Sequence, residues 1–595
     1  MCGYLGSITR KPIDINILLD SNQCQICRGP DETRHVEKKI GENEYILSLV
    51  FNRLSIIDLS QNASQPMLSK EFKTTLVFNG EIYNHVELRR ELEKVCIFNT
   101  SHSDTEVLLN GLSLEGSKFL NKIRGQFSLA FVDHKKNQIL LARDRLGQKP
   151  LFFKHSEESL QFSTNLKALI NLSKDKNIDE KQIINYLNFG VVASPNTIFK
   201  NVYKVNPATF MVFDLNDNIS LEEENLFWNI DSHVENNNFD QEKFLELFTE
   251  SVKYRLVSDV PVATFLSGGL DSTSITKKLY EVESKVNTFS IIHDEKKYDE
   301  SKWINKVVKK YNTNHTEIKI TTENVYEEVL NAINSLDEPY SDPSVVPSYV
   351  LSKNISSKFK VALSGDGGDE LLGGYQRFQN ALIDRNYFDN KISQLYSIYP
   401  GFLGSGSNLM MRSQDKAKSY FSTLEDDKLI KLLGLKSVLS LRDIFYKKSV
   451  DNYKSLMLSE YKFFLSEMML LKVDRTSMNN SLEVRSPFLD HKLIEYVLGS
   501  DMSKILSSNP KSPIKNFLSK DFEENFLNRD KMGFSFNLES WIYNNTNLLE
   551  DTFKNGTIVN SINPNILKKL MLFKSRINAH RLWKMLVLEL YLNSY

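Results

Sequence analysis

Residues 266–272, Leu-Ser-Gly-Gly-Leu-Asp-Ser, constrain the fold of this chain more than any other stretch. An apolar run over residues 260–266 leads into them, and helix-compatible residues over 274–279 follow. That order predicts a buried parallel strand, a tight glycine turn and the start of a helix. Paired glycines let backbone amides approach an anion, and a helix N-terminus adds partial positive charge. We therefore expect an anion-binding loop at this turn.

Three side chains of this loop suit a phosphate ligand. Ser267 and Ser272 offer hydroxyl groups, whereas Asp271 would repel a bare phosphate and so requires a bridging cation such as Mg²⁺. The phosphate loop of kinase-type enzymes needs Gly-Lys-Ser/Thr, and the chain has no Gly-Lys dipeptide. The loop instead resembles the pyrophosphate loop of enzymes that cleave ATP to AMP and pyrophosphate. An ordinary Ser/Gly turn is the alternative.

The composition narrows the class of protein. The chain has 595 residues, enough for several domains, with 25% charged and 41% hydrophobic residues. A formal net charge of −1 gives no electrostatic footprint for nucleic acid. No apolar run approaches the length of a membrane span, and the N-terminus does not read as a signal peptide. We expect a cytoplasmic enzyme that binds neither nucleic acid nor membrane.

The four cysteines are too few for a disulfide scaffold. Cys24 and Cys27 have the spacing of half a zinc site, but no second Cys/His pair follows closely. Cys2 directly follows the initiator methionine, and removal of that methionine would give Cys2 a free α-amine beside its thiol. Such an amine titrates near roughly 7.7–8, so part of it is an unprotonated base at neutral pH. Cys2 is thus a candidate N-terminal nucleophile, although alone it decides little.

Several later segments strengthen this interpretation. They contain two strand-like runs that end in polar residues, a helix-capping pattern at Ser103, and a hairpin pattern. The segments are residues 53–58, 79–84 and 103–107, and the hairpin of 125–133 with 138–144. Together, and in family order, they resemble the class II glutamine amidotransferase domain over about residues 2–210. The resemblance implies an αββα sandwich of the N-terminal nucleophile type.

The same resemblance implies roles for individual residues. Cys2 would attack the side-chain amide of glutamine, while Asn79 and the Gly80 amide would hold the oxyanion. Arg53 would pair with the α-carboxylate of glutamine through a bidentate fork. The implied glutamine-binding residues are Arg53, Leu54, Asn79, Gly80, Glu81 and Asp104, the last two at the α-amino end. A surface salt bridge is the alternative for Arg53 and Asp104.

The chain departs from the pattern of that family at two positions. Cys27 stands where the family usually has His, and Asn52 stands where a second Arg is common. Neither position does chemistry in the family, so the departures bear on local packing.

The composition changes after residue 213. Residues 213–218 read as the last turn of a first domain, and residues 222–241 are rich in Asn, Asp and Glu, as in a linker. Helical spacing of apolar residues resumes at Phe244. We therefore expect a first domain over residues 2–215, a linker over 216–243 and a second domain over 244–595.

The second domain continues the alternation of strand and helix signals. Strand-like residues 286–292 follow the first loop, and residues 361–363 end in a second loop, 364–375, that is dense in glycine and acid. Such alternation predicts a doubly wound sheet with its ligand at the carboxyl ends of the strands. Together with motifs at residues 470–490, 528–534 and 582–586, the loops resemble the synthetase domain of glutamine-hydrolysing asparagine synthetases. The resemblance implies an α/β ATP-pyrophosphatase domain with helical additions, beside an α+β first domain.

That resemblance implies an ATP site, with Mg²⁺ on Asp271 and Asp369. The implied ATP-binding residues are Leu266, Ser267, Gly268, Gly269, Asp271, Ser272, Ile291, Ser364 and Gly365. Lys531 would neutralise charge on the phosphates and on the adenylate. Asp366 matches a position where some members have Glu, proposed to assist attack by nitrogen, and a turn residue is the alternative.

Taken together, the sequence predicts a glutamine-dependent enzyme that makes asparagine from aspartate and ATP, with Mg²⁺. Ammonia would pass inside the protein from Cys2 to an acyl-adenylate, because free ammonia is mostly ammonium in neutral water. Relatives amidate uronic acids or close β-lactam rings; the intact Cys2 argues against the β-lactam reaction, and a uronic acid remains open. A non-catalytic regulatory protein is a third interpretation, and a homodimer is possible.

Overall fold

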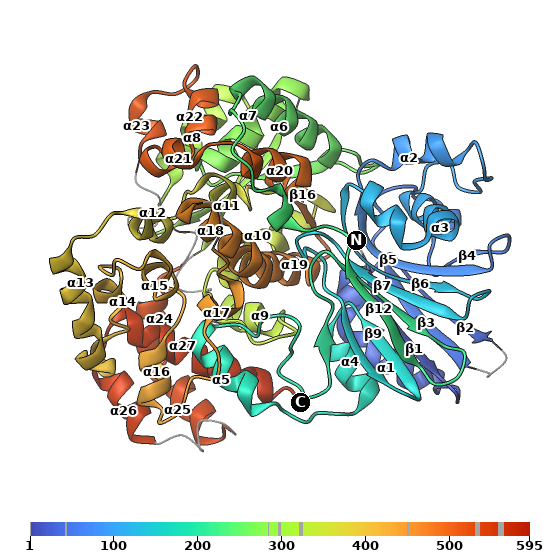
Figure 1. Ribbon diagram of the computed structural model, residues 1–595, viewed down its shortest axis with the longest axis horizontal. Helices are drawn as coiled ribbons and strands as arrows, with labels where there is room; N and C mark the ends of the chain where they lie inside the picture. The colour runs from blue at the N-terminus through green and yellow to red at the C-terminus, as the bar shows by residue number, and fades with distance from the viewer. Residues whose placement is uncertain are drawn as a thin grey trace.

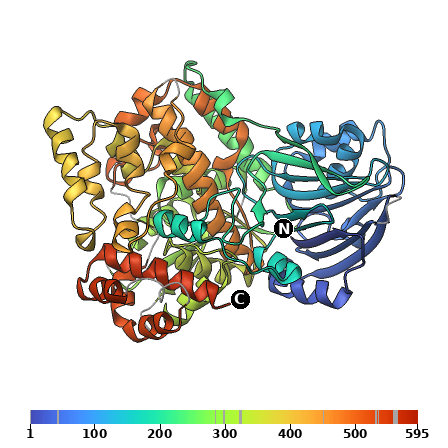
Figure 2. The ribbon, with the colours of Figure 1, turned by 60° about the horizontal axis from the view of Figure 1, so that its bottom comes forward.

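The computed structural model describes residues 2–41, 45–283, 285–295, 299–320, 325–448, 451–529, 533, 536–556 and 564–595. Figure 1 shows two halves that lie side by side: a sheet-rich half from the first third of the chain, and a larger, mostly helical half from the rest. The turned view in Figure 2 shows the same division, with both sheets of the first half stacked on one another.

The first half contains two six-stranded antiparallel sheets. One has the order β10-β8-β9-β1-β3-β2 and the other β12-β11-β7-β6-β5-β4. The strands are β1 (Gly3–Thr9), β2 (Glu32–Ile40), β3 (Tyr45–Arg53), β4 (Met67–Ser69), β5 (Thr74–Ile82), β6 (Gly125–Asp133), β7 (Gln138–Arg143), β8 (Phe152–Ser156), β9 (Ser159–Ser163), β10 (Tyr203–Lys204), β11 (Thr209–Asp214) and β12 (Ser220–Leu226). The pairing of β6 with β7 confirms the hairpin expected from the sequence.

Apolar side chains of both sheets meet between them, which explains why the central strands are buried on both faces. Tyr4 and Leu49 come from one sheet, Val77 and Leu141 from the other, and all four belong to one core. Helices cover the outer faces: α1 (Ile15–Asn22) and α4 (Leu166–Ser173) on the first sheet, α3 (Asp104–Glu115) on the second, with α2 (His85–Leu92) beside α3. These layers are the expected αββα sandwich.

Part of the stretch predicted as linker is a strand. β12 pairs with β11 at the edge of the second sheet, so the chain does not leave this sheet after residue 214. Its residues are mostly exposed Glu, Asn and Ser, and this polar composition indicated a linker although the backbone bonds to β11. An edge strand with charged side chains is also a common protection against pairing with other chains.

The second half is built on a parallel sheet of five strands with the order β15-β14-β13-β16-β17. The strands are β13 (Val262–Phe265), β14 (Asn287–His293), β15 (Asn314–Ile320), β16 (Val361–Leu363) and β17 (Glu483–Arg485). The chain starts at the centre, adds β14 and β15 on one side and then β16 and β17 on the other. The loops after β13 and β16 therefore diverge at a topological switch point, where such sheets bind ligands.

Helices cover this sheet and extend well beyond it. Helix α10 (Val345–Ser356) packs on β14, and α19 (Leu470–Met478) packs on β17 and on α10. Helix α7 (Leu270–Val282) follows β13, and its buried Ile275 and Leu279 share a core with the first turn of α10, whereas Val350 and Ile355 of α10 belong to a second core. The other helices near the sheet are α6 (Gln241–Arg255), α8 (Ser301–Tyr311), α9 (Val325–Asn334) and α11 (Gly368–Leu372), whereas α5 (Glu180–Phe189) packs on the later helix α16 (Asp427–Leu432). This arrangement is the expected doubly wound domain.

The helical additions follow in two groups. The first contains α12 (Gln376–Leu382), α13 (Tyr387–Gln394), α14 (Ser407–Met410), α15 (Lys416–Phe421), α16 (Asp427–Leu432), α17 (Leu441–Phe445) and α18 (Asn452–Ser459). The second contains α20 (His491–Gly499), α21 (Ser503–Ser508), α22 (Ser512–Leu518), α23 (Glu524–Leu527), α24 (Leu538–Asn544), α25 (Thr546–Lys554), α26 (Pro564–Leu572) and α27 (Arg576–Leu592). Within the described ranges, none of the helices is both long and apolar enough to cross a membrane.

Candidate functional site

Cys2 and Asn79 meet in the first half of the molecule. Cys2 directly precedes β1, and Asn79 lies on β5 of the other sheet. The Cys2 backbone nitrogen donates to Asn79 Oδ1 at 3.0 Å. Asn79 Nδ2 is buried and has no hydrogen-bond partner among the described residues. A buried donor without a partner is costly, so this NH₂ group is suited to an oxygen that arrives with a substrate.

Gly80 follows Asn79 where the strand allows no side chain. A Cβ at Gly80 would lie 2.0 Å from the carbonyl oxygen of Gln126, because β5 and β6 approach closely there. Directly after the Asn79 side-chain donor, the chain therefore offers a second donor, the backbone N–H of Gly80. The pair has the composition of an oxyanion hole.

Burial raises the pKa of the Cys2 thiol, while the Leu54 amide and the Arg53 charge act in the opposite direction. Arg53 ends β3, and Leu54 follows it. The buried Arg53 guanidinium donates to the carbonyl oxygens of Ser60 at 2.8 Å and Asp58 at 2.5 Å. It forms no ion pair with another described residue, so its charge is held in place but not neutralised. A carboxylate ligand would supply the missing charge.

The two acidic residues expected here have partners of their own. Asp104 begins α3 and accepts a hydrogen bond from the Ile82 amide at 3.1 Å. Glu81 forms an ion pair with Arg485 of the second half at 2.9 Å, while its Oε1 has no partner among the described residues. Burial and the nearby Asp104 raise the pKa of Glu81 well above its usual range, against the pull of Arg485. Glu81 therefore also joins the two halves, which the sequence did not indicate.

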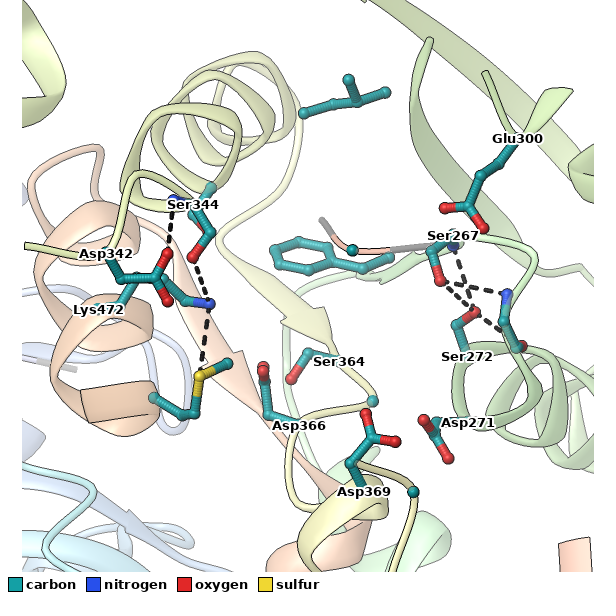
Figure 3. A pocket seen from close by; sticks show the side chains of 18 of the residues that line it. Ser267, Asp271, Ser272, Glu300, Asp342, Ser344, Ser364, Asp366, Asp369 and Lys472 are labelled. Atoms are coloured by element: carbon teal, nitrogen blue, oxygen red, sulfur yellow. Dashed lines mark hydrogen bonds between the residues drawn. The ribbon is translucent and has the colours of Figure 1, made fainter. Parts of the chain in front are cut away.

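The second site is a cavity of about 1380 Å³ at the switch point of the parallel sheet. The loops after β13 and β16 form one side, and the N-terminal part of α10 and α19 form the other. Figure 3 shows Ser267, Ser272 and Asp271 on one side of it, Asp369, Ser364 and Asp366 near the middle, and Asp342, Ser344 and Lys472 on the other side.

The first loop holds itself in place. Ser272 Oγ lies 3.1 Å from Ser267 Oγ and accepts from the Ser267 amide at 3.2 Å, and Ser267 Oγ accepts from the Gly269 amide at 3.2 Å. Gly268 has a φ of 69°, and a Cβ there would lie 2.9 Å from the Ile304 nitrogen. Helix α7 then starts with Gly269 as its N-cap and no side-chain cap. Its free N–H groups suit an anion.

Among the described residues, Asp271 and Asp369 both pair with Lys511. The Lys511 ammonium lies 2.5 Å from Asp271 and 2.6 Å from Asp369. Burial opposes the lysine charge, but the two carboxylates hold the pKa of Lys511 above its usual range. Sequence reasoning missed Lys511, because it lies far along the chain, at the N-cap of α22, and no local motif marks it.

Two carboxylates that share one cation also fit Mg²⁺. Such a site usually keeps one or two carboxylates and completes its shell with water and substrate phosphates. The described residues contain no group of three His, Cys, Asp or Glu that could hold a metal alone, which also leaves Cys24 and Cys27 without a zinc site. The donor set therefore suits a cation that arrives with a nucleotide.

The other residues expected to bind the nucleotide surround the same cavity. Leu266, Ile291 and Ser364 are buried at the carboxyl ends of β13, β14 and β16, and Gly365 follows Ser364. Ser364 Oγ is buried without a hydrogen-bond partner among the described residues. A Cβ at Gly365 would lie 3.0 Å from the Asp271 side chain, so the two loops touch.

Asp366 faces the cavity. Its carbonyl oxygen accepts from the Ser486 hydroxyl, and its carboxylate forms no ion pair or hydrogen bond with another described residue. Figure 3 shows this carboxylate between Lys472 and the pair of Asp271 and Asp369. Lys531, expected to act here, lies outside the described residues.

Comparisons with known proteins match both parts of the chain. A family model described as asparagine synthase matches residues 243–593, and one described as a glutamine amidotransferase domain matches residues 1–228. Asparagine synthetase [glutamine-hydrolyzing] 1 of Bacillus subtilis (strain 168) is 30% identical over 577 residues, 92% of this chain and 89% of that protein. Asparagine synthetase [glutamine-hydrolyzing] 3 of the same organism is 31% identical over 499 residues, 79% of this chain and 76% of that protein.

Among solved structures, one described as the allosteric regulatory enzyme of purine biosynthesis overlaps 44% of this chain and 60% of its own. The TM-score is 0.29 and the identity 16%. A TM-score this low does not establish a common fold.

Without nucleotide, a divalent cation should stabilise the Lys511→Met variant more than it stabilises the wild type. The variant leaves Asp271 and Asp369 facing one another without their shared lysine, so Mg²⁺ gains a place that the lysine no longer fills. We expect the melting temperature of Lys511→Met to rise more with added MgCl₂ than that of the wild type, in the absence of nucleotide. Lys353→Met, on an exposed pair of α10, is the control. An equal response in all three proteins would contradict the shared-cation geometry.

Proposed function

This chain belongs to the asparagine synthase family of glutamine-hydrolysing ligases, which use ATP as a substrate, and from that premise we propose that its acceptor is aspartate and its product asparagine. The other products are glutamate, AMP and pyrophosphate. Within this proposal, residues 2–215 hydrolyse glutamine, residues 216–243 connect the domains although they include β12, and residues 244–595 form the aspartyl-adenylate. A cytoplasmic location and a homodimer stay predictions.

We assign the glutamine reaction to the site around Cys2. After removal of Met1, the Cys2 amine takes the thiol proton and the sulfur attacks the amide carbon of glutamine. Asn79 Nδ2 and the Gly80 amide hold the oxyanion while ammonia leaves, and water then releases glutamate from the thioester. Arg53 and Leu54 position the α-carboxylate end, and Glu81 and Asp104 the α-amino end.

We assign ATP to the cavity at the switch point. Leu266, Ile291, Ser364 and Gly365 surround the adenosine part. The pyrophosphate part lies on the loop over residues 267–272, at the start of α7. Here the aspartate side-chain carboxylate attacks the α-phosphate, and pyrophosphate leaves from the helix N-terminus.

Asp271 and Asp369 would hold Mg²⁺, which neutralises phosphate charge when it is bound. Lys511, which the two carboxylates now share, is then free to turn to the phosphates. Lys531 would neutralise the adenylate. Asp366 accepts a proton from the ammonia that attacks the acyl carbon, directly or through a water, since Asp is one methylene shorter than Glu.

One observation carries this proposal: the same chain holds a buried Cys2 against Asn79 and a cavity in which two carboxylates share one lysine. The ion pair between Glu81 and Arg485 connects the two sites directly. A regulatory protein would have no need of either set of groups. The two half-reactions need both.

Aspartate should drive equimolar formation of AMP, pyrophosphate and asparagine. The first loop lacks the lysine of a kinase-type phosphate loop and carries the metal-compatible Asp271, so cleavage at the α-phosphate is expected. The measurement uses purified protein, glutamine, ATP and Mg²⁺, with aspartate or a hexuronic acid as acceptor. ADP and inorganic phosphate as products would overturn the ATP chemistry, and release of pyrophosphate with the hexuronic acid alone would overturn the acceptor.

Cys2→Ala should abolish synthesis with glutamine and preserve synthesis with ammonium salts. Only the release of ammonia requires the thiol, so the second cavity stays intact. The rate with ammonium should increase with pH as more of it becomes free ammonia. Amide formation is measured with each nitrogen source over a range of pH, and a variant that ammonium cannot rescue would refute the two-site mechanism.

Asp366→Asn should lower amide formation at least about tenfold, near 1.4 kcal/mol of transition-state stabilisation. The variant keeps size and most hydrogen bonding but removes the charge and the base. Glutamine hydrolysis should remain measurable, because Cys2 lies in the other half. Glutamate and amide are assayed side by side, and full amide synthesis would leave Asp366 as a turn residue.

A further inference from the structure

Lys472 lines the cavity on the side away from the pyrophosphate loop. It lies in α19, and 4% of it is exposed. Its ammonium donates to Ser344 Oγ at 3.2 Å and lies 3.9 Å from the Met469 sulfur. It forms no ion pair with another described residue. A buried ammonium with one hydroxyl and one thioether is poorly satisfied, because burial of a charge is costly unless it is paired.

The other buried or half-buried lysines and arginines of the lining have ion-pair partners, except Lys515, which is half-buried and donates to Asn509. Lys511 pairs with Asp271 and Asp369, Arg377 with Glu460, and Arg529 with Glu300. Lys574 and Arg576, also in the lining, are exposed. Among the described residues of the lining, Lys472 is therefore the most deeply buried cation without an ion pair.

A carboxylate accompanies this lysine. Asp342 lies two residues before Ser344, and its side chain accepts a hydrogen bond from the Ser344 amide at 2.8 Å. Ser344 therefore contacts Asp342 through its amide and Lys472 through its hydroxyl. Asp342 and Lys472 form no ion pair with one another, and Figure 3 shows both beside Ser344 at the same side of the cavity. The wall thus presents a positive and a negative group to one ligand.

The reacting end of the cavity is close to this pair. Figure 3 shows Asp366 and Ser364 between the pair and the first loop. The hydroxyl of Tyr340 is buried without a partner among the described residues. Burial, then Asp342, then Asp366 raise the pKa of Tyr340 well above its usual value.

We propose that Lys472, with Ser344, binds the α-carboxylate of the acceptor, and that Asp342 binds its α-ammonium group. The acceptor is then a free α-amino acid whose side-chain carboxylate points to Asp366 and to the α-phosphate. This inference rests on the proposed function and names the residues that select its substrate class. Lys472 and Asp342 are specificity-determining residues.

The charges of this wall separate two classes of acceptor. An acidic α-amino acid brings one carboxylate to react, a second for Lys472 and an ammonium for Asp342. A hexuronic acid has a single carboxylate, which is consumed in the reaction, and it has no cation. Bound here, it would leave the buried Lys472 and the half-buried Asp342 without a partner of opposite charge, at a cost of several-fold to more than a hundredfold in affinity.

The test removes one charge from the protein and the matching charge from the acceptor. Isoasparagine, the α-amide of aspartate, lacks the α-carboxylate, and succinate lacks the ammonium group. The measurement is pyrophosphate release with ammonium chloride as nitrogen source, so that glutamine hydrolysis is bypassed. Acceptors with undetectable turnover are measured as competitive inhibitors of aspartate.

Lys472→Gln should raise the KM for aspartate at least about tenfold and change the constant for isoasparagine little. Asp342→Asn should also raise the KM for aspartate but change the constant for succinate little. Asn keeps the hydrogen bond to the Ser344 amide, because its side-chain oxygen can accept as that of Asp does. Lys472→Gln thus loses the preference for aspartate over isoasparagine only, and Asp342→Asn loses the preference for aspartate over succinate only.

Lys353→Gln on α10 is the matched control, since that lysine pairs with Glu328 outside the cavity. Glutamine hydrolysis and the KM for ATP should stay near wild type in both test variants, which shows that both halves fold. Equal losses with aspartate and with the matched analogue would overturn the subsite. An unchanged KM for aspartate in both variants would also overturn the subsite. If the wild type still turns over aspartate, the proposed function stands in either case. Wild-type turnover of a hexuronic acid and none of aspartate would overturn both.

Discussion

The structure depends most on Arg485, which connects its two sites. This residue ends β17, is fully buried, and donates to Glu483, to Glu81 and to the carbonyl oxygens of Arg255 and Val257. Its own carbonyl accepts from the Ser364 amide at 2.9 Å. Ser364 lies in the nucleotide cavity and Glu81 follows the glycine of the oxyanion pair, so one residue spans from one site to the other. Burial opposes the charge, but Glu483 and Glu81 hold the pKa of Arg485 above its usual range.

A second buried network fixes how the halves meet. Asp474 of α19 binds Arg28 of the first half at 2.9 Å, and Lys149 and Arg475 lie at 3.4 and 3.5 Å. Burial would raise the pKa of Asp474, but these three cations hold it far below its usual value. Buried ion pairs add little net stability over apolar packing, whereas the loss of one partner is costly, about 3–5 kcal/mol. Their contribution here is therefore to orientation: any other docking of the halves would leave several charges buried and unpaired.

Local patterns in the sequence predicted the parts that neighbouring residues determine. The two glycine loops, the β6–β7 hairpin and the doubly wound sheet follow from short-range spacing, whereas the αββα sandwich was implied by the family resemblance. The linker prediction was wrong over Ser220–Leu226, because an exposed edge strand has the composition of a loop. Lys511 could not be found in this way: 142 positions separate it from Asp369, and only the tertiary fold brings them together at 2.6 Å. The partnership of Glu81 with Arg485 is hidden for the same reason, and the roles of the individual site residues stay predictions.

The distribution of charge in the cavity explains how its two ends can bind two different ligands that both carry negative charge. At the end that we propose for the nucleotide, the two carboxylates of Asp271 and Asp369 outnumber the one ammonium of Lys511 among the described residues, so an anionic nucleotide has to bring a cation of its own. At the opposite end Lys472 and Asp342 are held apart by Ser344 and balance only through a ligand that carries both charges. Two phosphate-like ligands would compete for the first end, and a neutral or singly charged acceptor would be poorly held at the second. The carboxylate of Asp366 lies between these ends, where the proposed mechanism brings the acyl group and the attacking nitrogen together.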